Sequence, residues 1–149
     1  MRRPWIALAL AATVAACGGD DALSTGEYRD RATVICRESR EATDAVEQPT
    51  RSTNAAIAAY FERLMAISRR TTAQFAELEP PEELAKAHGD ALAANREGVD
   101  EVQRLIRELE RGGDARALLQ GATGRLQQLS SRSRAAADRL GVPECARQE

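Results

Sequence analysis

The stretch LEPPEELAKAH, residues 78–88, separates two long helical patterns and decides how the chain can fold. Its pair Pro80-Pro81 stops a helix that arrives from the N-terminal side, because proline lacks the backbone N–H that a helix interior needs. Pro81 also suits the first turn of a new helix, and Glu82 and Glu83 then lie near the positive end of that helix. The stretch therefore predicts a sharp connection between two helices.

Apolar residues recur at alternating steps of three and four on both sides of this connection and elsewhere in the chain. This spacing puts them on one face of a helix. Such stripes cover residues 28–46, 57–78, 84–109 and 118–140, and polar members within them are Ser39, Thr71, Asn95 and Ser133. The central stripe positions, which we expect to form the core, are Leu64, Ile67, Leu92, Val99, Val102 and Leu129.

Capping and turn residues divide the chain at matching places. Ser24 and Glu27 have the spacing of a capping box at the start of the first helix. Pro49 ends that helix, and the GGD of residues 112–114 turns the chain between the third and fourth helices. The LGVP of residues 140–143 has a glycine just past a helix end and a proline beyond it, which predicts a stop.

Four amphipathic helices joined by short connections predict an all-α fold. The arrangement that they favour is an antiparallel up-down-up-down four-helix bundle over residues 24–149. No alternation typical of a β-strand accompanies them in the sequence.

The N-terminal segment has the pattern of an export signal. Arg2 and Arg3 precede an apolar run over residues 5–16, which is too short to span a bilayer as a helix. The run ends in VAAC, residues 14–17, and this resembles the lipobox of bacterial lipoproteins: an aliphatic residue, two small residues and a cysteine. The resemblance implies cleavage before Cys17 and attachment of lipid to its thiol.

On this interpretation the chain has three parts. Residues 1–16 are a signal peptide, residues 17–23 are the lipidated cysteine with a flexible acidic tether, and residues 24–149 are the bundle. An ordinary cleaved signal, in which Cys17 is incidental, is the alternative. The mature chain also resembles small helical lipoproteins of actinobacteria in YRDRATVIC (28–36), LEPPEELAKAH (78–88) and LGVPEC (140–145). That resemblance implies a fold and a location, and no activity.

Charge and composition exclude one class of partner. Without Arg2 and Arg3, residues 17–149 carry 19 basic and 23 acidic side chains, a formal charge of −4. No strong single-sign field is present to attract nucleic acid, so we expect none as a partner.

Two cysteines remain when Cys17 carries lipid. An even pair in an oxidising compartment predicts a Cys36–Cys145 disulfide. It requires the C-terminal tail to fold back along the first helix. Two free thiols, or a bridge between chains, are the alternatives.

His88 is the only histidine, and it lies on a stripe between Leu84 and Leu92. A metal site needs further ligands on the same face, and Asn95, two turns on, is a poor one. We expect His88 to be a buried or half-buried polar residue that is hydrogen-bonded to a neighbouring helix, with Asn95 as a further polar position. The alternative is a cofactor- or metal-binding envelope sensor that uses His88, including a haem held with Met65.

Charged residues are unequally divided between the last two helices. Arg132, Arg134 and Arg139 make the fourth helix basic, whereas the third is acidic. We expect these faces to complement each other or to keep the protein soluble. In the alternative, the basic face contacts anionic lipid headgroups or cell-wall polymers.

No pattern indicates catalysis. The sequence lacks the Gly-x-Ser-x-Gly of a nucleophile elbow, and its paired carboxylates fall on exposed helical faces. We therefore expect no enzyme and no cofactor. The expected function is that of a non-catalytic helical module, lipid-anchored through Cys17 on the extracytoplasmic face of the cell membrane, which binds an envelope protein or a small ligand.

Overall fold

The computed structural model describes residues 23–147, and every regular element in this range is a helix. Four long helices, α1 (Thr25–Asp44), α2 (Asn54–Ala76), α3 (Glu82–Glu110) and α4 (Ala115–Leu140), precede the short α5 (Pro143–Ala146). The predicted all-α class is confirmed. Cys17 and the predicted signal segment lie outside the described range. Within it, no helix combines the length and the apolar character needed to cross a membrane.

Local signals set most helix boundaries. Ser24 and Glu27 form the predicted capping box of α1, and Asp114 caps α4 through its side chain. Gly141 ends α4 with φ +71°, a left-handed conformation that glycine adopts without steric cost. Two boundaries differ from prediction. Pro81 lies one residue before α3 as its N-cap, and α1 ends at Asp44, well before Pro49.

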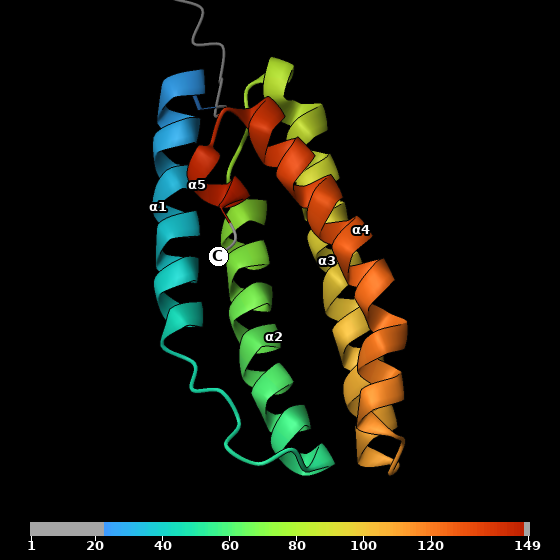
Figure 1. The fold of residues 1–149 in the computed structure, drawn as a ribbon. Helices are drawn as coiled ribbons and strands as arrows, with labels where there is room; N and C mark the ends of the chain where they lie inside the picture. The colour runs from blue at the N-terminus through green and yellow to red at the C-terminus, as the bar shows by residue number, and fades with distance from the viewer. Residues whose placement is uncertain (1–22, 148–149) are drawn as a thin grey trace, which may run out of the picture.

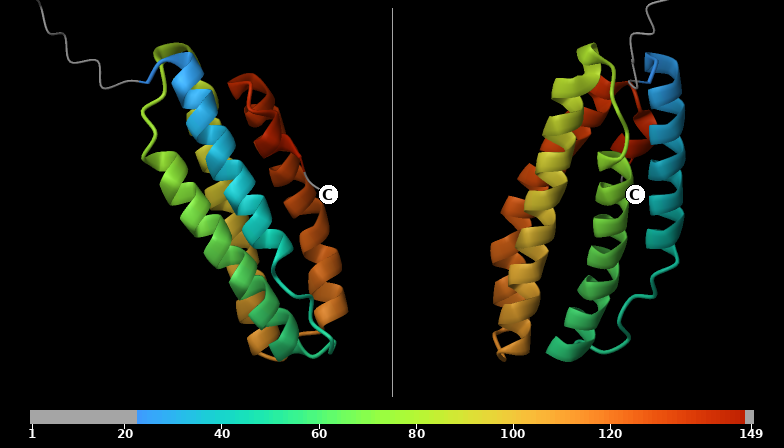
Figure 2. Two further views of the ribbon diagram at one scale, coloured as in Figure 1. Left: turned by 90° about the vertical axis from the view of Figure 1, so that its left-hand side faces the viewer. Right: turned by 180° about the vertical axis from the view of Figure 1, so that it is seen from behind.

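The helices pack as two pairs with a short helix between them. α3 packs against α2 on one side and α4 on the other, and α1 packs against α2. α5 contacts both α1 and α4, in the upper part of Figure 1. The views in Figure 2 also show α1 beside α2 and α3 beside α4. α5 was not predicted, and at this end it packs against both α1 and α4.

The buried core is divided between the two ends of the molecule. The upper cluster joins the start of α1, the end of α2, the start of α3 and the end of α4, and it includes Tyr28, Phe75 and Leu140. The lower cluster joins the start of α2 to the end of α3 through Ala58 and Leu109. Two of the predicted central residues pack against these clusters as partly buried side chains, Leu92 against the upper one and Val102 against the lower one.

The prediction of a fully buried central core was therefore confirmed for one position and only partly met at the others. Of the six central stripe residues only Leu129 is buried, with 3% of its surface exposed. The other five are partly exposed: Leu64, Ile67, Leu92, Val99 and Val102. The physical reason is that α2 and α4 pack on α3 and hardly on each other, so their apolar faces border an open space.

Candidate functional site

A groove runs along the face of α3 in the part of the molecule between the two core clusters. Its upper chamber, of about 450 Å³, is lined by residues of all five helices. Its lower chamber, of about 290 Å³, lies between α2 and α4 with α3 as its floor. Ser68, Asn95 and Ser133 line both chambers, so the two chambers are neighbours along α3, and we call them together the groove.

The length of α1 explains why the lower chamber is open. α1 has 20 residues and α3 has 29. At about 1.5 Å per residue, α1 is shorter than α3 by about 13 Å. No residue of α1 or of the connection after it lines the lower chamber. This chamber thus occupies the space that a longer α1 would cover.

The polar stripe residues meet in the upper chamber, one from each long helix. Ser39 comes from α1, Thr71 from α2, Asn95 from α3 and Ser133 from α4, and all four line this chamber. Thr71 Oγ1 donates a hydrogen bond to Ser39 Oγ at 2.8 Å, and Ser133 Oγ donates to Asn95 Oδ1 at 3.3 Å. We call these four residues the polar layer. It gives the upper chamber hydroxyl and amide groups beside apolar and charged side chains.

Charged side chains surround the upper chamber and balance one another. Glu144 accepts a hydrogen bond from Arg40 at 3.0 Å and forms an ion pair with Arg147 at 3.1 Å. Asp44 also lines this chamber, so its two arginines and two carboxylates have a formal charge of zero. No charged residue lines the lower chamber.

The lower chamber is mostly apolar. Beyond the three residues that it shares with the upper chamber, its lining has one hydroxyl, that of Ser130. On its floor, a Cβ added to Gly98 would meet no other atom within 4 Å. The apolar lining residues of α2, α3 and α4 are Phe61, Leu64, Met65, Ala94, Val99, Val102, Leu126 and Leu129.

A disulfide holds the wall of the upper chamber. Cys36 of α1 is bonded to Cys145 of α5, with their Cα atoms 5.1 Å apart. The C-terminal tail folds back along α1, as the sequence predicted. Both cysteines line the upper chamber. The bond therefore links α5 to α1 covalently at the wall of the upper chamber.

His88 lies in the upper core and outside the groove. It is 7% exposed, and its Nδ1 lies 2.9 Å from the hydroxyl of Tyr28, which is fully buried. Burial lowers the pKa of His88 and raises the pKa of Tyr28 to about 12. Both groups are then neutral near pH 7, so the contact is a hydrogen bond between an uncharged hydroxyl and an uncharged imidazole. This matches the interpretation of His88 as a buried residue bonded to a neighbouring helix.

The structure separates the polar positions that the sequence singled out. Asn95 lines the groove, whereas His88 does not. Met65 packs against the lower core cluster, and His88 contacts Tyr28 and Phe75 of the upper one. Among residues 23–147, no group of three or more His, Cys, Asp or Glu side chains is placed to hold a metal ion.

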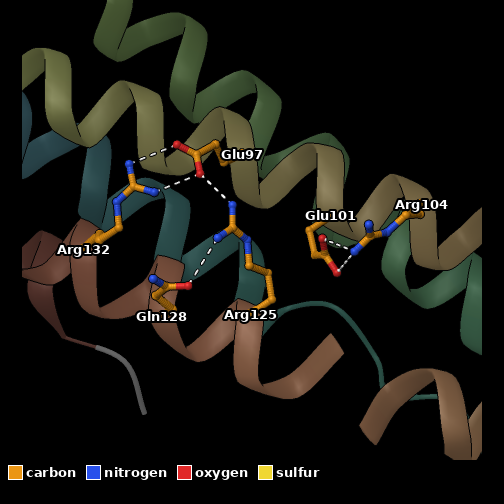
Figure 3. A network of polar contacts seen from close by, with 6 residues as sticks. All are labelled: Glu97, Glu101, Arg104, Arg125, Gln128 and Arg132. Carbon is orange, nitrogen blue, oxygen red and sulfur yellow. Dashed lines mark hydrogen bonds and ion pairs between the residues drawn. The ribbon is translucent and has the colours of Figure 1, made fainter. Parts of the chain in front are cut away.

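The acidic face of α3 and the basic face of α4 meet each other. Figure 3 shows Glu97 of α3 between Arg132 and Arg125 of α4, at 2.8 and 3.0 Å. Asp90 forms a further pair with Arg139 at 3.0 Å. The hydrogen bond from Arg132 lowers the pKa of Glu97. These contacts follow the expectation of complementary faces within the protein, and they engage three arginines of the basic helix.

Comparisons with protein-family models, with curated proteins and with solved structures found no match to this chain.

Proposed function

We propose that this protein is a lipid-anchored, extracytoplasmic module of the cell envelope, without catalytic activity, that binds a ligand or a segment of an envelope partner. The observation that carries the binding function is the groove over α3, an accessible hollow in the middle of the molecule with a polar and an apolar chamber. Concave sites of about 300–1,000 Å³, mostly apolar and with a few placed polar groups, are typical of ligand binding.

The location rests on the N-terminal sequence and is supported by the disulfide. Residues 14–17 resemble a lipobox, and Arg2 and Arg3 precede the apolar run. The Cys36–Cys145 bond supports export, because disulfides persist in oxidising compartments and are rare in the cytosol. A lipid on Cys17 would hold the protein at the membrane, since stable anchoring needs two apolar chains, such as those of a diacylated cysteine.

The helix arrangement that we propose is the antiparallel up-down-up-down four-helix bundle, opened on one side. Arg29, in the first turns of α1, donates a hydrogen bond at 2.9 Å to the carbonyl oxygen of Leu140 at the end of α4. Asn54, at the start of α2, donates to the carbonyl oxygens of Leu109 and Gly113, near the end of α3. Both contacts join the start of one helix to the end of another, as alternating helix directions require.

The chemistry of the groove favours binding over catalysis. Its polar layer offers hydroxyls and an amide, and its carboxylate Glu144 is engaged with two arginines. The alternative, a cofactor- or metal-binding sensor that uses His88, would require His88 to leave its hydrogen bond with Tyr28.

Two measurements test this proposal in the cell. Replacing Cys17 with serine should release the protein from the membrane fraction or leave an unprocessed precursor, and the wild-type N-terminal peptide should carry a lipid mass. A photoreactive amino acid at Leu126, which lines the lower chamber, should give a defined adduct on irradiation, detected by intact mass. The same amino acid at the exposed Gly124, outside the groove, is the control. Soluble wild-type protein would contradict the anchor, and equal labelling at both positions would contradict the groove.

A further inference from the structure

We infer that the groove binds an amphiphile with a single apolar chain and an uncharged head group that forms hydrogen bonds. This inference deepens the proposed function and rests on it. Its basis is the adjacency of two chambers along α3, one that contains the polar layer and charged side chains and one that is mostly apolar.

The upper chamber suits the head group. The polar layer presents Ser39, Thr71, Asn95 and Ser133 from four different helices, within one hollow of about 450 Å³. Hydroxyl and amide groups both donate and accept hydrogen bonds, which suits the hydroxyls or amides of a ligand. The charges that line this chamber sum to zero, and Glu144 already pairs with two arginines. This chamber has no excess charge that would neutralise an ionic head group. We therefore expect it to bind a head group without charge.

The lower chamber suits an apolar chain. Leu64, Val99 and Leu126 are partly exposed there, on three different helices. Covering apolar surface is worth about 25 cal/mol per Å². The backbone at Gly98 leaves the floor clear, because no atom lies within 4 Å of the position that a side chain would enter. The chamber is about 290 Å³ in volume and shares Asn95 and Ser133 of the polar layer with the upper chamber, so a chain attached to a bound head group would extend into it.

The same features argue against a partner helix as the occupant. A helix is about 10–12 Å across with its side chains and presents a continuous apolar stripe. Here the polar layer interrupts the apolar surface, and α5, held by the Cys36–Cys145 bond, contacts both α1 and α4. A helix long enough to follow the groove would meet hydroxyl groups and then α5.

The test uses the full chain with Cys17→Ser, purified without detergent, and isothermal titration calorimetry with 1-decanoylglycerol below its micelle concentration. We expect saturable binding at one site. Shortening the chain to 1-octanoylglycerol should weaken binding by up to about 15-fold, since each buried methylene contributes about 0.8 kcal/mol. Decanoate, which has the same chain length and an ionised head, should bind more weakly. Absence of binding, or decanoate binding as tightly as the glycerol ester, would overturn the inference.

A matched pair of variants locates the site. Gly98→Leu places a side chain in the lower chamber and should weaken binding at least ten-fold, whereas Gly124→Leu, at an exposed position outside the groove, should leave the affinity unchanged. A Cβ at either glycine meets no atom within 4 Å, and replacing glycine inside a helix raises stability, so neither variant should lower the melting temperature. Asn95→Ala should reduce the preference for the glycerol ester over decanoate. Equal affinities of the two leucine variants would refute the placement.

Further outcomes separate this inference from the proposed function. A dimer of the chain that Gly98→Leu abolishes in sedimentation analysis would assign the groove to a second copy and overturn the amphiphile. A protein-sized adduct at position 126 in the cell would assign the groove to a partner protein and would also overturn the amphiphile. A small adduct without binding of 1-decanoylglycerol would refute this ligand class and leave the proposed function intact. No adduct at all would overturn both.

Discussion

The buried pair Tyr28–His88 supports a prediction that can be developed in detail. In the Tyr28→Phe variant, His88 Nδ1 loses the hydrogen-bond partner that lies 2.9 Å away, in a site where both residues are at most 7% exposed. A buried polar atom left without its partner costs about 1–3 kcal/mol. Replacing both partners, in Tyr28→Phe/His88→Leu, removes the unsatisfied atom and should cost less than the sum of the two single changes. The double-mutant cycle formed by these variants should give a coupling free energy of about 0.5–3 kcal/mol between Tyr28 and His88, as found for residues in contact.

The same pair sets a pH dependence whose sign follows from the two pKa shifts. Burial lowers the pKa of His88 below its ordinary value of 6.5, so the unfolded chain binds the proton first as the pH falls. Stability is then full above about pH 6.5 and declines as the pH falls through the lower pKa of the folded protein. On the alkaline side, the pKa of Tyr28 is raised from 10.0 to about 12, so stability is lost as the pH rises from about 10 to 12. At about 1.4 kcal/mol per pKa unit, the alkaline loss is on the order of 3 kcal/mol.

Urea denaturation followed by circular dichroism, at a series of pH values, measures these effects. The His88→Leu variant should lose the acidic decline that wild-type protein shows as the pH falls below about 6.5, relative to its own value at pH 8. Tyr28→Phe should lose the alkaline decline. The reasoning is refuted if His88→Leu keeps the full acidic decline, or if the two single changes add without coupling.

Three further predictions concern the scaffold of the groove. Replacing Cys36 and Cys145 with serine should lower the free energy of unfolding by about 2–5 kcal/mol, since the bond closes a long loop with a sequence separation of 109; free thiols in non-reducing peptide maps of wild-type protein would contradict the bond. Gly141→Ala should cost about 1–2 kcal/mol because its φ is +71°, and an unchanged denaturation midpoint would disprove this. Leu129→Ala should lower the free energy of unfolding by about 2–5 kcal/mol, and Ile67→Ala should lower it clearly less because Ile67 is partly exposed. Equal losses in the two variants, measured in the same assay, would contradict this.

The candidate site could be predicted in its components and not in its assembly. Ser39, Thr71, Asn95 and Ser133 stand out in the sequence as polar members of apolar stripes, one in each long helix. That they form one layer depends on the rotation and vertical offset of four helices relative to one another, and residue spacing within one helix does not carry this information. The same holds for the partner of His88, which is 60 residues away in the sequence.

The sequence by itself determined where most of the helices begin and end and which pair of cysteines is joined. Ser24 with Glu27, Asp114 and Gly141 act on backbone groups within a few residues of themselves, so their effect does not depend on the rest of the fold. Only the tertiary structure decided that the middle of the molecule is open. The stripes predicted a continuous core because periodicity shows which face of a helix is apolar and does not show what that face meets. The groove exists because α1 stops at Asp44 while α2 and α4 both pack on α3, and the path of α5 back to α1 closes only one end of it.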